Sequence, residues 1–428
     1  MHILLNLYPW YLPRRNRELR THLDLMGLSA TYPEMRFSLA RSVPATVLGN
    51  AAWLTQYALD RLSIGRSLLH RSYLYHAATT FNWLPRSLVR ALKPDLLFGH
   101  EYLPFNLSSR DLPVVFETAA LTSEMRHYRS FYTPEKVQAF IRLNTRAKYR
   151  AASQATLVNI REPFGADKFR SQFPELAHKV RTVPPFLEYI SSLPYERAVD
   201  KHLAAKRIKL LFVGNDARRK GLPILVAAIR RLPKETASLL DVTIVSQFLD
   251  GAVDTAGIGA QVISGGRLTL GEAFGPTSAV IKQGPLTVHE VMAHMAESHI
   301  FAMPTLSDTF GFVYLEAMAN GCAIIGPNAQ PQSWILDHGR AGMMVNPART
   351  EALASTIESL IVDRDLRTKL AVGAWQRYHA TFAPPIVATQ YRRLFEEAIE
   401  LHKSSNPVAL RGRSIRNLAL QKAGQTYP

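Results

Sequence analysis

The chain has 428 residues, of which 47% are hydrophobic and 20% charged, a composition that excludes an intrinsically disordered protein and favours two folded domains. Lys and Arg number 51 against 34 Asp and Glu, a net charge of +17, which favours anionic partners: nucleic acid, an anionic membrane surface or phosphorylated substrates. The single cysteine, Cys322, excludes an internal disulfide, and the apolar N-terminus followed by charge is the reverse of a signal peptide, so we expect a cytoplasmic protein.

The first half of the chain alternates short apolar segments with helical patterns. Residues 135–152 have clear helical periodicity, and residues 36–93 predict two or three amphipathic helices rich in Arg and Trp. Residues 1–95 hold twelve basic and five acidic residues, so docking on anionic lipid and an ordinary core with a solvated rim remain equally open. The alternation predicts a parallel α/β sheet, with strands at 2–7, 96–99, 113–116 and 155–159.

A second α/β series follows a Pro-punctuated connection at 184–196. Two such series predict two Rossmann-like domains facing one another across a cleft, residues 1–190 and 191–400. The basic tail that follows, residues 401–428, is interpreted as a frayed end or as an anion-seeking helix. The strands of the second series are expected at 208–213, 241–245, 260–263, 278–282, 299–303 and 322–326.

A basic loop follows the first strand of the second series, in FVGNDARRKGLPILVAAIRRL (212–232). Arg218, Arg219 and Lys220 lie between the strand end at Gly214 and a helix that starts near Gly221. A phosphate is stabilised at such a place by the helix dipole, free N–H groups and cationic side chains. Phosphate binding and a merely solvated basic loop remain equally open from this stretch alone.

The segment PTLSDTFGFVYLEAMANGCAIIGPN (304–328) predicts a loop that leads into a helix over residues 310–320. Thr309, Phe310 and Gly311 would place free backbone N–H groups at the helix N-terminus. Asp308 precedes that terminus, and it is either the N-cap of the helix or a contact to a ligand.

Glu316 lies eight residues beyond Asp308, among Val313, Leu315 and Met318. An unpaired carboxylate in such apolar surroundings is costly, so we expect Glu316 to have a specific partner. A pair of sugar hydroxyls suits a carboxylate, because its two oxygens can accept from both.

This segment resembles the signature of the family 4 glycosyltransferases of the GT-B fold, in which an acid, Phe-Gly and Glu-Ala-Met-Ala-x-Gly follow a Pro-Ser/Thr lead-in. The basic loop resembles the phosphate loop of the same family, and residues 284–305 resemble the helix and strand that precede the acid pair. The resemblance covers about 205–350 with several motifs in order, whereas over 1–190 it is architectural.

The resemblance implies a role for each matching residue. Glu316 would hold the ribose of a nucleotide-sugar donor, Asp308 would contact the transferred sugar, and Lys220 would stabilise charge on the leaving phosphate. The backbone at 309–311 would face the diphosphate, and the loop at Val280–Gln283 would border the base. The implied donor-binding residues are Gly214, Asn215, Arg219, Lys220, Lys282, Asp308, Thr309, Phe310, Gly311 and Glu316.

Two positions depart from the family pattern. Asp308 stands where the family usually has Glu, one methylene longer, and Asn215 stands where it usually has Arg after the glycine of the phosphate loop. The family also often places a His near the acceptor, where this chain has Glu117 and Thr118. We assign catalytic roles to Asp308, Lys220 and Glu117, with a structural role as the alternative for Glu117.

The implied function is transfer of a sugar from a nucleotide-diphosphate sugar, with retention of configuration, to a saccharide or lipid-linked acceptor, such as a growing bacterial saccharide. No cofactor or metal is expected, and a peripheral position at the inner face of a membrane remains open beside the cytoplasmic location. Two alternatives keep the fold: a non-catalytic nucleotide- or polyanion-binding protein, and a nucleotide-sugar isomerase. Nucleic-acid binding is the weakest candidate, because no recognisable module accompanies the charge.

Overall fold

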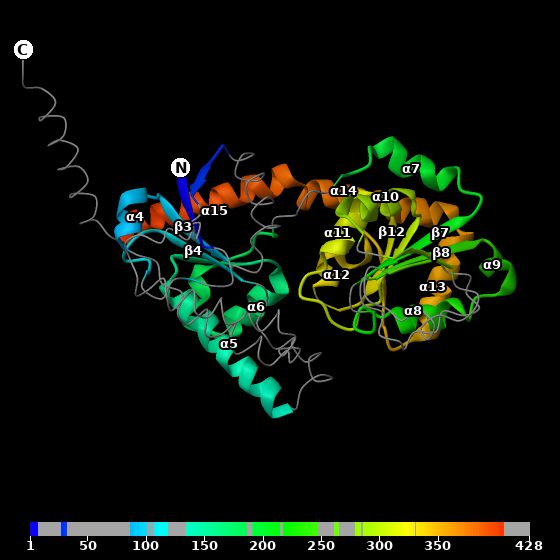
Figure 1. The fold of residues 1–428 in the computed structure, drawn as a ribbon, viewed down its shortest axis with the longest axis horizontal. Helices are drawn as coiled ribbons and strands as arrows, with labels where there is room; N and C mark the ends of the chain where they lie inside the picture. Colours follow the sequence, from blue (N-terminus) through cyan, green and yellow to red (C-terminus); the bar gives the residue numbers. More distant parts are fainter. Residues whose placement is uncertain are drawn as a thin grey trace, which may run out of the picture. The chain divides into compact units, whose positions relative to one another are not determined.

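The computed structural model describes residues 1–6, 27–31, 86–100, 103, 107–118, 134–185, 191–214, 217–246, 261–264, 279–283, 286–329 and 331–405. The chain forms two compact units (Figure 1). Unit 1 combines Met1–Phe186 with Val387–Pro428, and unit 2 is Leu187–Ile386.

Unit 1 contains a parallel six-stranded sheet in the order β2-β1-β3-β4-β5-β6. Strands β3, β4 and β5 are buried throughout, and they are apolar except for polar residues near their carboxyl ends, as expected for a parallel sheet covered on both faces. The strands are β1 (His2–Asn6), β2 (Ser29–Thr31), β3 (Leu96–His100), β4 (Val114–Thr118), β5 (Leu157–Ile160) and β6 (Val180–Arg181).

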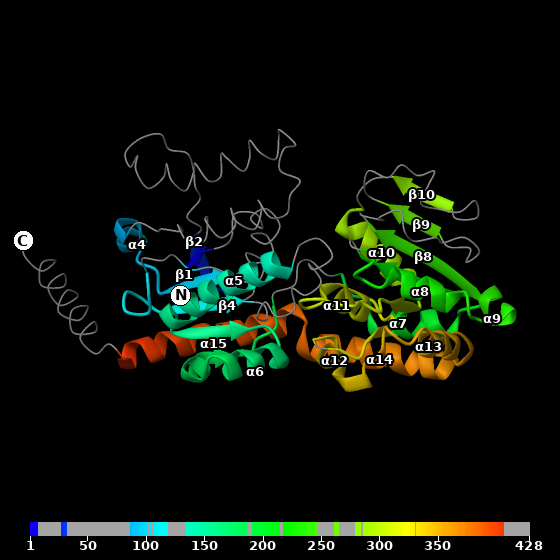
Figure 2. The ribbon, with the colours of Figure 1, turned by 90° about the horizontal axis from the view of Figure 1, so that it is seen from below.

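Helices cover both faces of this sheet (Figure 2). Helices α5 (Pro134–Gln154) and α6 (Pro163–Gln172) contribute Ala152, Phe169 and others to the core on one face. Helix α15 (Pro384–Ser405) lies on the other face, where Leu394 and Phe395 pack against Phe98. The remaining elements of unit 1 are α4 (Arg86–Leu92) and the 3-10 helix η3 (Pro174–Lys179).

Unit 2 contains a parallel seven-stranded sheet in the order β10-β9-β8-β7-β11-β12-β13. The chain builds outward from β7 in one direction and from β11 in the other, so the switch point of the sheet lies between these neighbouring strands. The strands are β7 (Ile208–Val213), β8 (Leu240–Ser246), β9 (Gln261–Ser264), β10 (Ala279–Gln283), β11 (Ile300–Ala302), β12 (Ala323–Pro327) and β13 (Met343–Val345).

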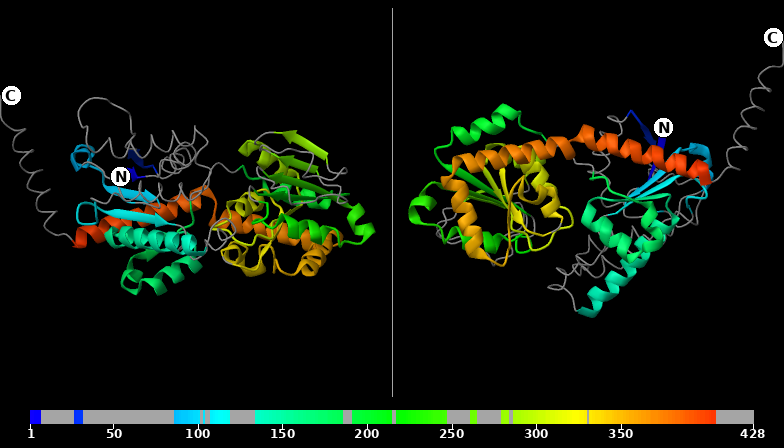
Figure 3. Two further views of the ribbon diagram at one scale, coloured as in Figure 1. Left: turned by 60° about the horizontal axis from the view of Figure 1, so that its bottom comes forward. Right: turned by 180° about the vertical axis from the view of Figure 1, so that it is seen from behind.

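Two helical layers enclose this sheet (Figure 3). Helices α8 (Leu222–Ile229) and α13 (Thr350–Val362) pack together on one side, and α10 (Val288–Glu297), α11 (Phe312–Ala319) and α14 (Arg364–Thr381) on the other. Their apolar faces and the strands form one continuous core. The remaining elements are α7 (Tyr195–Leu203), α9 (Lys234–Ser238), α12 (Gln332–Ile335) and η4 (Asp337–Gly339).

The predicted strands and the helix over 135–152 are confirmed within a few residues at each end. The predicted second domain ended at residue 400, whereas the structure returns the chain to unit 1 from Val387, because the apolar face of α15 packs on the first sheet. Of the helices expected over 36–93, α4 is described and the rest lies outside the described residues, as does the tail beyond Ser405. Among the described helices, none has the length and apolar content needed to cross a membrane.

Candidate donor-binding site

Two loops of unit 2 meet at the switch point of its sheet. The loop after β7 carries Gly214, Arg219 and Lys220, and the loop after β11 leads from Pro304 to Gly311. The carboxyl ends of parallel strands meet at one edge of a sheet, and ligands bind there at the switch point. The structure therefore brings together residues from two motifs that are far apart in the sequence.

Lys220 and Asp308 form an ion pair across the two loops. Their side chains are only 13% and 11% exposed, so the pair is largely shielded from water. The second Asp308 oxygen accepts the Thr309 N–H at 2.9 Å. Asp308 is not the N-cap of α11, because the cap residue is Gly311. The N-cap interpretation is thus wrong: the carboxylate holds the Lys220 ammonium instead.

Three further hydrogen bonds, each accepted by a backbone carbonyl, join the same two loops. The Arg219 guanidinium donates to the Ser307 carbonyl at 2.7 Å, and the Arg219 carbonyl accepts from the Leu306 N–H at 2.8 Å and from the Thr305 hydroxyl at 3.1 Å. Arg219, expected to contact the donor, therefore also ties one loop to the other. These bonds fix the positions from which Lys220 and Asp308 extend.

Gly221 allows the loops to approach each other this closely. Its φ is +83°, and a Cβ there would lie 2.1 Å from the Pro304 carbonyl oxygen. Glycine adopts this left-handed conformation without steric cost and leaves room for the opposite backbone. The predicted glycine before α8 is therefore required both by conformation and by space.

The backbone at the N-terminus of α11 suits an anionic ligand. Gly311, with φ +99°, precedes the helix, and no side chain caps it. The first N–H groups of an α-helix have no intrahelical acceptor, and the helix dipole makes this end attractive to anions. Gln332 donates to the Phe310 carbonyl at 3.1 Å, and the Phe310 side chain is buried in the core. These two contacts with the core fix the position of the loop.

Glu316 lies in the second turn of α11 and is partly exposed. The expectation that it sits buried in apolar surroundings is wrong, since the side chain keeps access to solvent. It lies near Tyr378: burial raises the pKa of Tyr378, and the Glu316 charge raises it further. The ribose-binding role of Glu316 remains a prediction from the resemblance.

Two predicted donor residues are not placed with the others. Asn215 lies outside the described residues. Lys282 belongs to β10, where only the backbone is described, and β10 is separated from β7 by β9 and β8.

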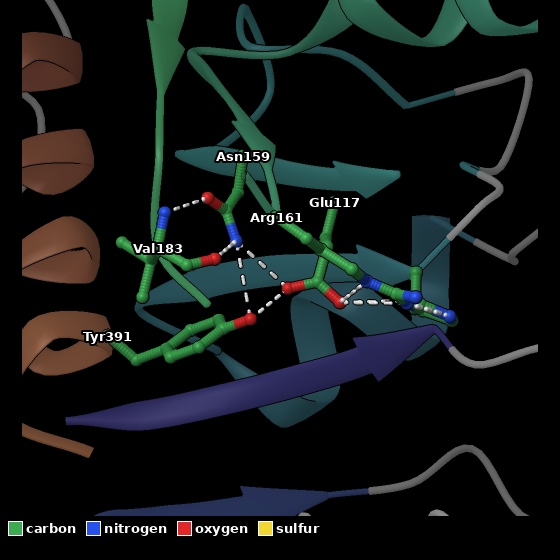
Figure 4. A network of polar contacts seen from close by, with 6 residues as sticks. Glu117, Asn159, Arg161, Val183 and Tyr391 are labelled. Atoms are coloured by element: carbon green, nitrogen blue, oxygen red, sulfur yellow. Dashed lines mark hydrogen bonds and ion pairs between the residues drawn. The ribbon is translucent and has the colours of Figure 1, made fainter. Parts of the chain in front are cut away.

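Glu117 belongs to unit 1, at the end of β4, and is 2% exposed (Figure 4). One carboxylate oxygen accepts from His100 Nδ1 at 2.8 Å and from Arg161 Nη2 at 3.3 Å. The other accepts from the Asn159 amide at 3.0 Å and from the Tyr391 hydroxyl. Glu117 is thus the shared acceptor of a buried network within unit 1, whereas Lys220 and Asp308 belong to unit 2.

The network keeps Glu117 ionised. Burial raises the pKa of its carboxyl, but the Arg161 charge and the hydrogen bonds from His100 and Tyr391 together hold that pKa well below its ordinary value. The Arg161 Nη2 also lies 2.7 Å from His100 Nε2. With Nδ1 donating to Glu117, the other ring nitrogen, Nε2, accepts from Arg161.

Three partners of Glu117 were missed by the sequence analysis. Asn159 and Arg161 flank the end of β5, next to the polar ends of β3 and β4, and this repeated strand-end polarity was a usable signal. Tyr391 comes from α15, 274 positions away in sequence, and no local pattern pointed to it.

Comparisons with known proteins agree with this architecture. Residues 207–363 match the family model described as Glycosyl transferases group 1, and this segment contains the two loops and α11. The fold is also that of sucrose-phosphate synthase from Thermosynechococcus elongatus (TM-score 0.56, 14% identity, covering 92% of this chain and 98% of that one). Anabaena Alr3699/HepE in complex with UDP is similar as well (TM-score 0.53, 13% identity, 92% and 99% covered). The chain thus has the two Rossmann-like units of the GT-B fold.

A curated relative is the D-inositol 3-phosphate glycosyltransferase of Paenarthrobacter aurescens (strain TC1). It is 26% identical over 222 residues, which cover 51% of this chain and 51% of the relative. The chain therefore spans about half the length of this relative.

Proposed function

We propose that the protein is a glycosyltransferase that uses a nucleotide-diphosphate sugar bound in unit 2. The observation that carries the proposal is the shielded Lys220–Asp308 pair beside the uncapped N-terminus of α11. It lies at the switch point of a parallel sheet, within the segment that matches the glycosyltransferase model. A diphosphate needs cationic and N–H donors together, and this place supplies both.

The proposed division of labour follows from the chemistry of each group. Lys220 and the α11 N-terminus stabilise the negative charge that builds on the departing diphosphate. The Asp308 carboxylate accepts from hydroxyls of the transferred sugar, and Glu316 accepts from the ribose. The bond between the anomeric carbon and the diphosphate oxygen breaks, and the bond to an acceptor hydroxyl forms. A base or the departing phosphate takes the hydroxyl proton.

Further features are proposed from the resemblance and the charge. They are retention of the anomeric configuration, independence of a metal, and a saccharide or lipid-linked acceptor at the cytoplasmic side of an anionic membrane. The name of the Paenarthrobacter relative states a phosphate-bearing acceptor, D-inositol 3-phosphate. A phosphate-bearing acceptor also suits the net charge of +17.

The test uses UDP-, GDP- and ADP-sugars, with donor hydrolysis and sugar transfer followed by mass spectrometry. We expect one donor class to be consumed, and Glu316→Ala and Lys220→Met to lower turnover by about 10²-fold or more. Arg340→Gln, an exposed arginine of unit 2, is the matched control. Undiminished turnover in the Glu316 and Lys220 variants would overturn the proposal.

One observation favours a non-catalytic alternative. Asp308 already neutralises Lys220, and the alternative is a site that binds nucleotide without turning over a sugar. Titration calorimetry that detects UDP or GDP binding, with no product from any donor, supports this second function. Product analysis also separates transfer from isomerisation of the nucleotide sugar.

A further inference from the structure

Helix α5 exposes a basic strip on unit 1. Arg142, Arg146 and Arg150 follow one another at four-residue intervals, and all three are exposed. Four-residue spacing advances only about 40° around a helix, so the three side chains share one face. They extend over about 12 Å along the helix axis.

The opposite side of α5 is buried. Asn144, Lys148, Ala151 and Ala152 face the core of unit 1. The helix therefore presents two distinct sides, one packed on the sheet and the other basic and solvent-facing. From residue 138 to 154 the sequence contains no Asp or Glu, so no acid within this part of the helix offsets the arginines.

An aromatic side chain accompanies the strip. Tyr149 is 39% exposed, and its ring lies 5.0 Å from that of Phe173. The nearby Glu175 carboxylate accepts from its hydroxyl and raises the pKa of Tyr149. Tyrosine is enriched where an apolar ring meets the headgroup layer of a membrane.

We propose that the strip formed by Arg142, Arg146, Tyr149 and Arg150 docks on an anionic lipid bilayer. A plane of negative charge complements arginines aligned on one helix face, and the amphipathic tyrosine fits the interface. Nucleic acid is the competing polyanion, but base recognition asks for further stacking or hydrogen-bonding groups, and the described strip holds a single aromatic residue. This proposal rests on the membrane location given in the proposed function and names the surface that would make the contact, but it does not depend on the donor chemistry of unit 2.

The test is vesicle flotation of the full chain with phosphatidylglycerol and phosphatidylcholine in equal parts, compared with phosphatidylcholine alone. Each basic residue near such a surface contributes about 1 kcal/mol, or roughly fivefold in affinity. We therefore expect Arg142→Gln/Arg146→Gln to bind anionic vesicles roughly 25-fold more weakly. The matched control is Arg340→Gln/Arg364→Gln, which removes two exposed arginines from unit 2 and should leave binding unchanged.

Added salt should weaken binding of the unaltered chain, and neutral vesicles should bind little. Equal loss in both double variants, or equal binding to neutral vesicles, would overturn the proposal. Binding to a single-stranded oligonucleotide that depends on Arg142 and Arg146, without vesicle binding, would overturn it in favour of nucleic acid. Donor hydrolysis in solution should be the same in both double variants. If no protein, altered or unaltered, hydrolyses a donor, this result contradicts the proposed function and leaves the docking proposal unaffected.

Discussion

At the residue scale, the Lys220–Asp308 pair holds two opposite charges that are largely shielded from solvent. Removing one partner leaves the other charge without its counterion, which costs more than removing both. We expect Lys220→Met and Asp308→Asn each to lower the free energy of unfolding by roughly 1–3 kcal/mol. The double variant should lose less than the sum of the two.

Urea unfolding of the four proteins measures this coupling as a double-mutant cycle. Sugar-transfer activity should not show this coupling. It should stay low in both Lys220→Met and the double variant, since both lack the cation that stabilises the leaving group. Losses of stability that add without coupling would contradict the ion pair.

Two buried histidines of unit 2 predict a dependence of stability on pH. Burial lowers the pKa of His202 to about 3 and that of His299 to about 4. His299 Nδ1 accepts the Lys209 N–H at 2.9 Å, and it loses this bond if it gains a proton. Since the folded pKa lies below the unfolded value of about 6.5, stability is full above that pH and falls as pH drops toward the folded values.

Between pH 7.5 and pH 5 the expected loss is about 2 kcal/mol per histidine. Urea unfolding at the two pH values measures it. His299→Gln should flatten the profile, whereas His289→Gln, a change at an exposed histidine of α10, should not. A profile as steep in His299→Gln as in the unaltered chain would contradict the assignment.

Lys220 and Asp308, two of the expected donor residues, were predictable as neighbours from local sequence, because each lies in a loop that follows a strand. Lys220 and Asp308 follow β7 and β11, and neighbouring parallel strands bring their loops together. That they pair with each other was not predicted, since the pairing depends on how closely the two loops approach each other in the folded chain. The same limit applies to Glu117, whose partner Tyr391 lies in a distant helix.

At the element scale, the junction between the β7 loop and α8 depends on a glycine. Gly221→Ala should destabilise unit 2 by roughly 3 kcal/mol or more, because strain at positive φ adds to a collision with the Pro304 carbonyl. Gly339→Ala is the matched control: its φ is +101°, but the nearest atom to a Cβ is Met344 Cε at 3.7 Å. It should cost only the backbone strain, about 1 kcal/mol.

Thermal unfolding compares the two variants directly. Similar shifts of the unfolding temperature in the two variants would show that the collision with Pro304 contributes nothing to the loss of stability. A fall in donor binding only in Gly221→Ala is expected, since the same contact sets the position of Lys220.

Most elements were predictable because buried parallel strands are short apolar runs bounded by polar residues. β2, β6 and β13 were not, since each has only two or three residues and none lies in a longer apolar run. β11 is equally short, but it lies in the apolar run 300–303 and was predicted. The docking of α15 was also missed. An amphipathic pattern such as that of α15 identifies a helix that buries one face, but it does not identify the sheet that the face covers.

At the scale of the whole molecule, Tyr391 ties the end of the chain to the first sheet. Tyr391→Phe keeps the ring packed near Phe98 and removes only the hydroxyl. A buried charged acceptor then loses a donor, which we expect to cost about 1–3 kcal/mol in unfolding. Tyr195→Phe, at an exposed tyrosine of α7, is the control.

The ionisation of Glu117 also predicts the pH range in which the hydrogen bond from Tyr391 stabilises the fold. Its folded pKa lies below the unfolded value, so its stabilisation is present above the unfolded pKa of about 4.3 and is lost as pH falls. The difference between Tyr391→Phe and the unaltered chain should therefore persist at neutral pH and shrink in strong acid. A difference that grows in acid would contradict the network.

The return of α15 to the first sheet also sets an order of assembly during synthesis. Unit 2 is contiguous, Leu187–Ile386, and all of it has left the ribosome before residues 387–398 emerge. While the second half of the chain is translated, the face of the first sheet that α15 covers is therefore still exposed. During the same time Glu117 lacks its hydrogen bond from Tyr391. The part of the chain made first completes its core last. During that interval the nascent protein exposes apolar strands, which is when a chaperone would be most needed.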